Sequence, residues 1–149
     1  MQRSLLLLLC ALISAVAARA TPMSKWPTIG TFATSDGGRA TIFLDTHSIT
    51  RHDHFWTARL RTLFTIDQKT DGGGSFRSEM DVYAYDCREA RAALVSSVRY
   101  RSDDVTGAVV AEIKHSAPSE YQWSSTAPGS AMDVARRITC DLAKMAQGD

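Results

Sequence analysis

Three histidines and two aspartates gather in one polar stretch of this chain. His47, His52 and His54 lie within residues 45–54, together with Asp45 and Asp53. Neutral imidazoles and carboxylates are competent ligands for zinc or copper. Their spacing matches no standard metal-binding motif, however, and histidines in polar loops are usually solvated. We therefore predict no metal site and no cofactor in this stretch.

The other reactive side chains do not form a catalytic arrangement in the sequence. Serine pairs at 96–97 and 124–125 and His115 are present, but no nucleophile elbow places them. Glu79 and Asp81 would share one face of a strand, whereas a glycosidase needs a cleft between its two carboxylates. Pairing with arginines across a sheet is the more ordinary role for these acids. We predict no catalytic residues and no enzymatic activity.

The first twenty residues have the pattern of a secretory signal peptide. A basic start at residues 1–4 precedes an apolar run at 5–16 and the small residues that end at Ala20. Cleavage after Ala20, or alternatively after Ala17, would leave one domain over residues 21–149. The run is too short to span a bilayer comfortably, and no later stretch is apolar for longer. We predict an exported protein without a membrane span.

Cleavage of the signal peptide would also change the cysteine and charge counts. Cys10 would be removed, and Cys87 and Cys140 would remain as an even pair, which in an exported chain favours a disulfide over two free thiols. Loss of Arg3 and Arg19 from the 17 basic residues leaves 15 against 16 acidic ones, a net charge of −1. Such a balance, with both signs interspersed, gives no basic surface for nucleic acid.

The elements that must position these residues are strands joined by turns, followed by one helix. Alternating patterns predict strands at residues 26–33, 39–45, 56–67, 76–87, 95–101 and 108–115, with residues 46–53 irregular and 88–93 either a loop or one helical turn. In the third strand, Trp56, Ala58, Leu60, Phe64 and Ile66 form the predicted core face. Glycine-rich turns at 35–38 and 71–74 join neighbouring strands, so the sheet is an antiparallel meander.

The only long helix is predicted near the end of the chain, over residues 130–145. Ser130 is a good N-cap, and Asp133 lies near the positive end of the helix dipole. Apolar residues at 131, 134, 135, 138, 142 and 145 form one stripe, but Cys140 lies about opposite its centre. Either the helix loosens near Thr139, or a second layer covers its other side. The predicted fold class is α+β, a sheet of about six strands with this helix packed on one face and tied by the disulfide.

Five residues are candidates for binding a partner. Trp26 is an aromatic anchor near the mature start. Arginines on two strands would supply guanidinium groups that can bind carboxylates of a protein ligand or of a second copy: Arg59 and Arg61 on one, and Arg99 and Arg101 on the other. Alternatively, these arginines pair with acids on the sheet, among them Glu79, Asp81 and Glu112, and only solubilise it.

Several of these features together resemble a known family. They are Trp26, Asp45, the sequence Tyr85-Asp86-Cys87, Tyr100 followed by Gly107, and Trp123 followed by Pro128-Gly129-Ser130 and Cys140. In this order they resemble the surface-adhesin protein E family of Gram-negative bacteria, over most of the mature chain. The resemblance implies a six-stranded antiparallel sheet with a tethered C-terminal helix. It also implies a non-enzymatic surface protein that binds host extracellular-matrix or serum proteins and can pair into homodimers.

One departure from the family leaves a second function open. The family's namesake is a lipoprotein, whereas here Leu9 precedes Cys10, at a position where bacterial lipoprotein signals have a small residue. The chain would then be either an adhesin-type binding module, secreted or at the cell surface, or a soluble periplasmic accessory or ligand-binding domain of the same fold.

Overall fold

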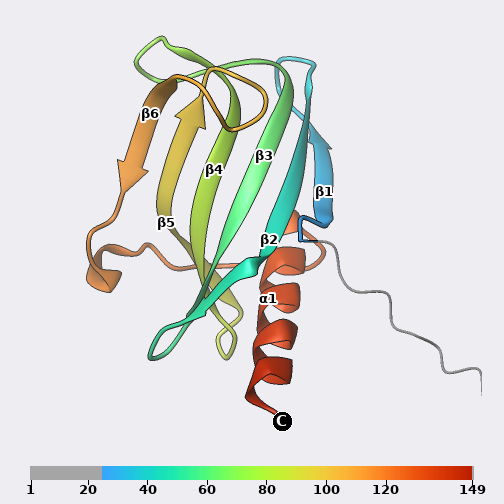
Figure 1. Cartoon of the computed structure of the whole chain (residues 1–149), viewed down its shortest axis with the longest axis vertical. Helices are drawn as coiled ribbons and strands as arrows, with labels where there is room; N and C mark the ends of the chain where they lie inside the picture. Colours follow the sequence, from blue (N-terminus) through green and yellow to red (C-terminus); the bar gives the residue numbers. More distant parts are fainter. Residues whose placement is uncertain (1–24, 149) are drawn as a thin grey trace, which may run out of the picture.

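The computed structural model describes residues 25–148, so the predicted signal peptide at residues 1–20 lies outside the described residues. An antiparallel sheet, strongly twisted, has the strand order β1-β2-β3-β4-β5-β6, and the helix α1 packs against it (Figure 1). Fold class and meander order are therefore as predicted. The strands are β1 (Thr28–Ala33), β2 (Arg39–Arg51), β3 (Trp56–Lys69), β4 (Ser75–Asp86), β5 (Arg91–Tyr100) and β6 (Val109–Lys114). A 3-10 turn (Pro118–Glu120) and the short β7 (Ser124–Ser125), which pairs with β5, lead to α1 (Ala131–Gln147).

Two predicted turns join β1 to β2 and β3 to β4. Gly37 and Gly73 adopt positive φ angles of 86° and 82°, which residues with a side chain rarely take. Each turn is closed by a backbone hydrogen bond, from Thr34 N to Gly38 O at 3.0 Å and from Thr70 N to Gly74 O at 2.8 Å. The glycine run at 72–74 is therefore a turn, as predicted.

The prediction that residues 46–53 are irregular was wrong for most of that stretch. β2 continues to Arg51, with a bulge between Asp45 and Thr50 in its pairing with β3. The Ser48 hydroxyl fills the gap, because it accepts a hydrogen bond from the Arg59 N–H at 2.8 Å and donates to the Asp45 carbonyl at 2.8 Å. Polar side chains here replace the missing ladder bonds, which is why a polar sequence still forms a strand.

Smaller corrections concern strand ends and one core residue. β1 begins at Thr28 and not at Trp26, and β5 begins at Arg91, directly after a turn over residues 87–90. Ile66, predicted in the core, is 38% exposed. The pairing of β3 with β4 shifts between Leu63 and Gln68, so the alternation that places Phe64 inside no longer holds for Ile66.

The core lies between the sheet and α1. Leu44, Leu60 and Tyr85 are fully buried there, with Ala135 from the helix. A second small cluster, of Ala40, Phe64 and Phe76, lies toward the hairpin ends of the strands, and its phenyl rings meet edge to face at 5.5 Å. β4 carries buried residues on both faces, as expected for a central strand.

The helix begins as the sequence predicts. Ser130 is the N-cap, and its hydroxyl accepts a hydrogen bond from the Asp133 N–H at 3.2 Å. Asp133 in turn binds Arg136 at 2.8 Å and Arg137 at 3.3 Å. Hydrogen bonds from Arg136 and from the Gly129 N–H hold the pKa of Asp133 below its ordinary value. At the other end, Gly148 closes the helix in the left-handed conformation.

The predicted apolar stripe of the helix was right in part: Ala131, Val134 and Ile138 pack against the core, but the most buried residues lie to one side of the stripe. α1 does not loosen near Thr139, and its buried side is formed by Ala135, Thr139, Cys140 and Ala143, about a third of a turn from the stripe centre. Met145, at the edge of the stripe, is 65% exposed. The buried residues are small because the helix lies close to the sheet, and this also brings Cys140 within reach of β4.

Cys87 and Cys140 form the predicted disulfide. Their Cα atoms are 5.8 Å apart, and the bond joins the end of β4 to the middle of α1 across 53 positions in the sequence. The helix is therefore held at two points, by its N-terminal loop and by this bond.

Gly30 in β1 lies against Ala131, at the start of α1. A Cβ atom at this position would lie 2.9 Å from the Ala131 Cβ, closer than side chains pack. We expect Gly30→Val to lower the free energy of unfolding by about 2 kcal/mol, because the helix must shift to make room. Urea denaturation would measure it, with Ala33→Val, at an exposed position of the same strand, as the control. Equal stability of the two variants would contradict the close packing.

Candidate binding surface

The side of the sheet away from α1, called here the outer face, carries two rows of side chains that run across five strands. Residues opposite each other in an antiparallel pair point to the same side. In β3 the two rows are represented by Arg59 and Arg61, which flank Leu60. Because the Leu60 side chain belongs to the core under the helix, both rows point away from the helix. The first row is Phe43, Arg61, Met80, Val98 and Glu112, and the second is Asp45, Arg59, Val82, Ser96 and Lys114.

Arg61 is held between two aromatic rings at the centre of the outer face. Its guanidinium carbon lies 4.9 Å from the centre of the Trp26 ring and 4.8 Å from that of Phe43. Such cation–π contacts fix the position of the guanidinium group without neutralising its charge. Within residues 25–148, no carboxylate pairs with Arg61. A partner's carboxylate can therefore take that place.

Arg59, by contrast, already has an acidic partner. Its Nη2 lies 2.7 Å from Asp45 Oδ2, and the Asp45 side chain is fully buried. Asp45 Oδ1 also accepts the His47 N–H at 3.1 Å, next to the bulge of β2. This pair stabilises the irregular pairing of β2 with β3, and it leaves Arg59 less available for a ligand than Arg61.

The four arginines singled out in the sequence do not form one surface. Arg99 pairs in register with Glu79, which is on the helix side of the sheet, and its Nε lies 3.5 Å from Glu79 Oε2. It also stacks on Phe76, 4.9 Å from the ring centre. Arg101 follows the end of β5 and is exposed in the turn toward β6. The alternating pattern shows which residues of one strand share a face, but it does not relate that face to a face of another strand. The position of Arg59 and Arg61 therefore could not predict the side of the sheet on which Arg99 lies.

Glu79 and Asp81 lie together on the helix side of β4, as their spacing predicts. Asp81 pairs with Leu60 and with Ser97, and Glu79 with Thr62 and Arg99. Burial, followed by the charge of Asp81, raises the pKa of Glu79 to about 7 against the opposing effect of Arg99. Burial also raises the pKa of Asp81, whose Oδ1 has no hydrogen-bond partner within residues 25–148. The single guanidinium group of Arg99 thus offsets the negative charge of both Glu79 and Asp81.

The histidines are spread along the end of β2 and the turn that follows it. The His52 ring stacks on Phe55 at 4.8 Å, and its Nε2 lies 3.2 Å from the Thr57 hydroxyl. His47 lines a groove beside the helix, and His54 is exposed in the turn. In the described part of the chain, no three side chains of His, Cys, Asp or Glu form a group that could hold a metal ion.

A family model described as surface-adhesin protein E matches residues 26–141. The chain belongs to this family. The match contains Trp26, Arg61 and both cysteines, so the stack on the outer face and the disulfide lie within the family's common region. A comparison with curated protein sequences gives no match.

Solved structures of Haemophilus influenzae protein E are similar to this family member. One, in crystal form II, has a TM-score of 0.52 and 13% sequence identity, over 67% of this chain and 80% of that one. Another, from the non-typeable bacterium, has a TM-score of 0.47 and 12% identity, over 69% and 71%. At such low identity the first structure shows a shared fold alone. No helix within residues 25–148 is long and apolar enough to cross a membrane.

Proposed function

We propose that the protein is an exported, non-enzymatic binding protein that takes a protein partner on the outer face, around Arg61. Membership of the surface-adhesin family supports a binding role. The observation that carries the location is the Arg61 guanidinium, fixed between Trp26 and Phe43 and without an acidic partner in residues 25–148.

The surroundings of Arg61 have the composition of a protein interface. Aromatic residues, methionine and arginine are enriched at such interfaces, and lysine and glutamate are depleted at their centres. Phe43, Met80 and Val98 are half-buried next to Arg61, while the charged Glu112 and Lys114 lie at the edge of the same rows on β6. An apolar centre with an oriented guanidinium and a charged rim would suit an acidic patch on a folded protein.

The partner class that fits the family is an extracellular-matrix or serum protein of a host, met by a secreted or surface-displayed form. The competing function is that of a soluble periplasmic accessory or ligand-binding domain, and Leu9 before Cys10 favours it, because a chain without a lipid anchor is not held at the surface. On either function, the same outer face can also pair two copies of the chain into a homodimer.

Arg61→Ser is expected to weaken binding to a purified matrix protein by about thirtyfold, which corresponds to a loss of about 2 kcal/mol at a central interface residue. Trp26→Ser should weaken it in the same direction, because the guanidinium would no longer be fixed. Surface plasmon resonance against a panel of immobilised matrix and serum proteins measures both variants. Sedimentation at several concentrations measures self-association in the same samples.

Arg101→Ser is the matched control, since this arginine is exposed but lies in the turn after β5. It should leave binding unchanged. Binding that is equal in wild type and in a folded Arg61→Ser variant would move the site away from the outer face. Cell fractionation tests the function itself: protein confined to the periplasm of intact cells would exclude the adhesive role and leave the accessory one.

A further inference from the structure

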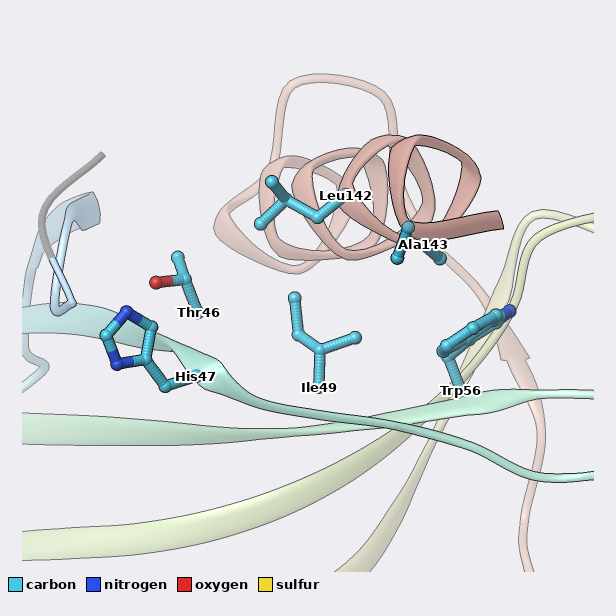
Figure 2. Close-up of a pocket in the computed structure, with 7 residues that line it drawn as sticks. Thr46, His47, Ile49, Trp56, Leu142 and Ala143 are labelled. Atoms are coloured by element: carbon cyan, nitrogen blue, oxygen red, sulfur yellow. The ribbon is translucent and has the colours of Figure 1, made fainter. Parts of the chain in front are cut away.

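An apolar groove lies between the second half of β2 and the last turns of α1, on the side of the molecule away from Arg61 and its rows. It has a volume of about 320 Å³ and is lined by Ile49, Leu142, Ala143, Ala146 and Trp56, with Thr46 and His47 at one end. Figure 2 shows Ile49 on β2 and Leu142 on the helix on opposite sides of this space, with Trp56 at the far end from His47. The most buried side of α1 does not coincide with the predicted apolar stripe, so Leu142 is left half-buried beside the sheet, and the groove lies against it.

A second hollow, of about 200 Å³, adjoins the groove and shares Trp56 and Ala143 with it. Three cations line this hollow: Arg51, Arg88 and Lys144. None of them forms an ion pair with a described residue. Asp53 is the one acid among the residues that line it, so the hollow has an excess of positive charge.

Trp56 stands between the apolar and the cationic space. Its ring lines the groove, and its indole nitrogen lies at the end of the ring away from Ile49 (Figure 2). Among residues 25–148, no group accepts a hydrogen bond from this N–H. The junction therefore offers an unused donor next to three unpaired cations.

The Cys87–Cys140 disulfide fixes the relative position of the two spaces. Both cysteines line the cationic hollow, and Ala143, one turn of helix after Cys140, belongs to both. Because the bond holds this part of α1 to the end of β4, the groove and the cations are presented together without first having to assemble. A preformed site loses less conformational entropy when a ligand binds.

We propose that this combined site binds an amphipathic carboxylate of the fatty-acid type. The acyl chain lies in the groove between Ile49 and Leu142, and the carboxylate passes Trp56 to reach Arg88 and Lys144. The helix C-terminus and Asp53 bring negative charge to this end of the site. The three cations outweigh that charge, so a small anionic head group is still attracted. Leu142 and Ala146 follow residue 141, where the family match ends, so this site depends on residues of this chain outside the common region.

Calorimetric titration of the mature protein with decanoate, below its micelle concentration, tests the site. Ala146 is exposed, so Ala146→Trp fills the groove without disturbing the core and should abolish binding. Arg88→Ser and Lys144→Ser should each weaken it by about tenfold or more, as expected for the loss of a charge-assisted hydrogen bond. Decanol, which has the same chain without the charge, should bind more weakly than decanoate.

Lys114→Ser, at an exposed lysine on β6, is the control and should leave decanoate binding unchanged. Arg61→Ser should also leave it unchanged, which separates this site from the one on the outer face. The proposal is overturned if decanoate does not bind, if Ala146→Trp binds it as well as wild type, or if decanol binds equally. Binding to phosphatidylglycerol vesicles without binding of free decanoate would also overturn it, in favour of a membrane surface.

Discussion

Replacing Cys140 with serine should lower the free energy of unfolding by about 4 kcal/mol, because the disulfide closes a long loop in the unfolded chain. The two cysteines are 53 positions apart, and the loop contains β5, β6 and the first half of the helix. The loss should fall mainly on the second half of α1, where the buried residues Thr139, Cys140 and Ala143 are small and offer little apolar area to hold the helix in place.

Urea denaturation of the wild type, of Cys140→Ser and of the double serine variant measures this effect. The double variant is the necessary control, since a single serine leaves Cys87 free to form mixed disulfides. Its stability should match that of reduced wild type. A decrease below 1 kcal/mol in both variants would show that packing alone places the helix, and that the bond contributes little.

The buried acids of β4 should make the protein less stable as the pH rises from 5 to 8. The pKa of Glu79 is raised from 4.5 to about 7 in the folded protein, first by burial and then by the charge of Asp81. Between these two values the folded state binds more protons than the unfolded state, so the free energy of unfolding falls with increasing pH. The decrease begins near pH 4.5 and is complete somewhat above pH 7.

Glu79→Gln should remove most of this dependence. Glutamine has the shape of the protonated acid and carries no charge, so the variant should be more stable than wild type at pH 8, by on the order of 3 kcal/mol, and nearly equal to it at pH 4. Asp81, Arg99 and Tyr83 are the titratable groups near Glu79, and Asp81 retains Arg99 in the variant.

Thermal unfolding at pH 4, 6 and 8 distinguishes the outcomes. Glu112→Gln, at an exposed acid on β6, is the control and should follow wild type at every pH. A Glu79→Gln variant that loses stability at pH 8 would mean that the ion pair with Arg99 outweighs the burial of the charge. In that case the pH dependence would have to come from other groups.

The sequence predicted those parts of the fold that depend on local patterns. Alternation placed the strands, the glycine runs at 35–38 and 71–74 placed two turns, and Ser130 placed the start of the helix. The disulfide followed from an even cysteine count in a chain with a signal-peptide pattern. Each of these features depends on residues that are close in sequence, or on a count.

Features that depend on distances between elements could not be predicted in this way. The helix stripe was only partly right, because a hydrophobic pattern shows which residues are apolar and not how closely the helix backbone approaches the sheet, as it does at Gly30 and Ala131. Phe43 was not recognised as a partner of Arg61, because it lies on the neighbouring strand, 18 positions earlier. The groove at Leu142 was missed for the same reason as the stripe.

The order of the strands has a consequence for how the chain reaches this structure. Each strand of the main sheet pairs with its neighbour in the sequence, so every hairpin closes a short loop, and the sheet can assemble by local steps. The helix is different, since Ala131 meets Gly30, 101 positions away. Until it docks, the face that carries Leu44, Leu60 and Tyr85 remains open to other chains. A sheet that has formed before its helix has docked is therefore the species most exposed to aggregation.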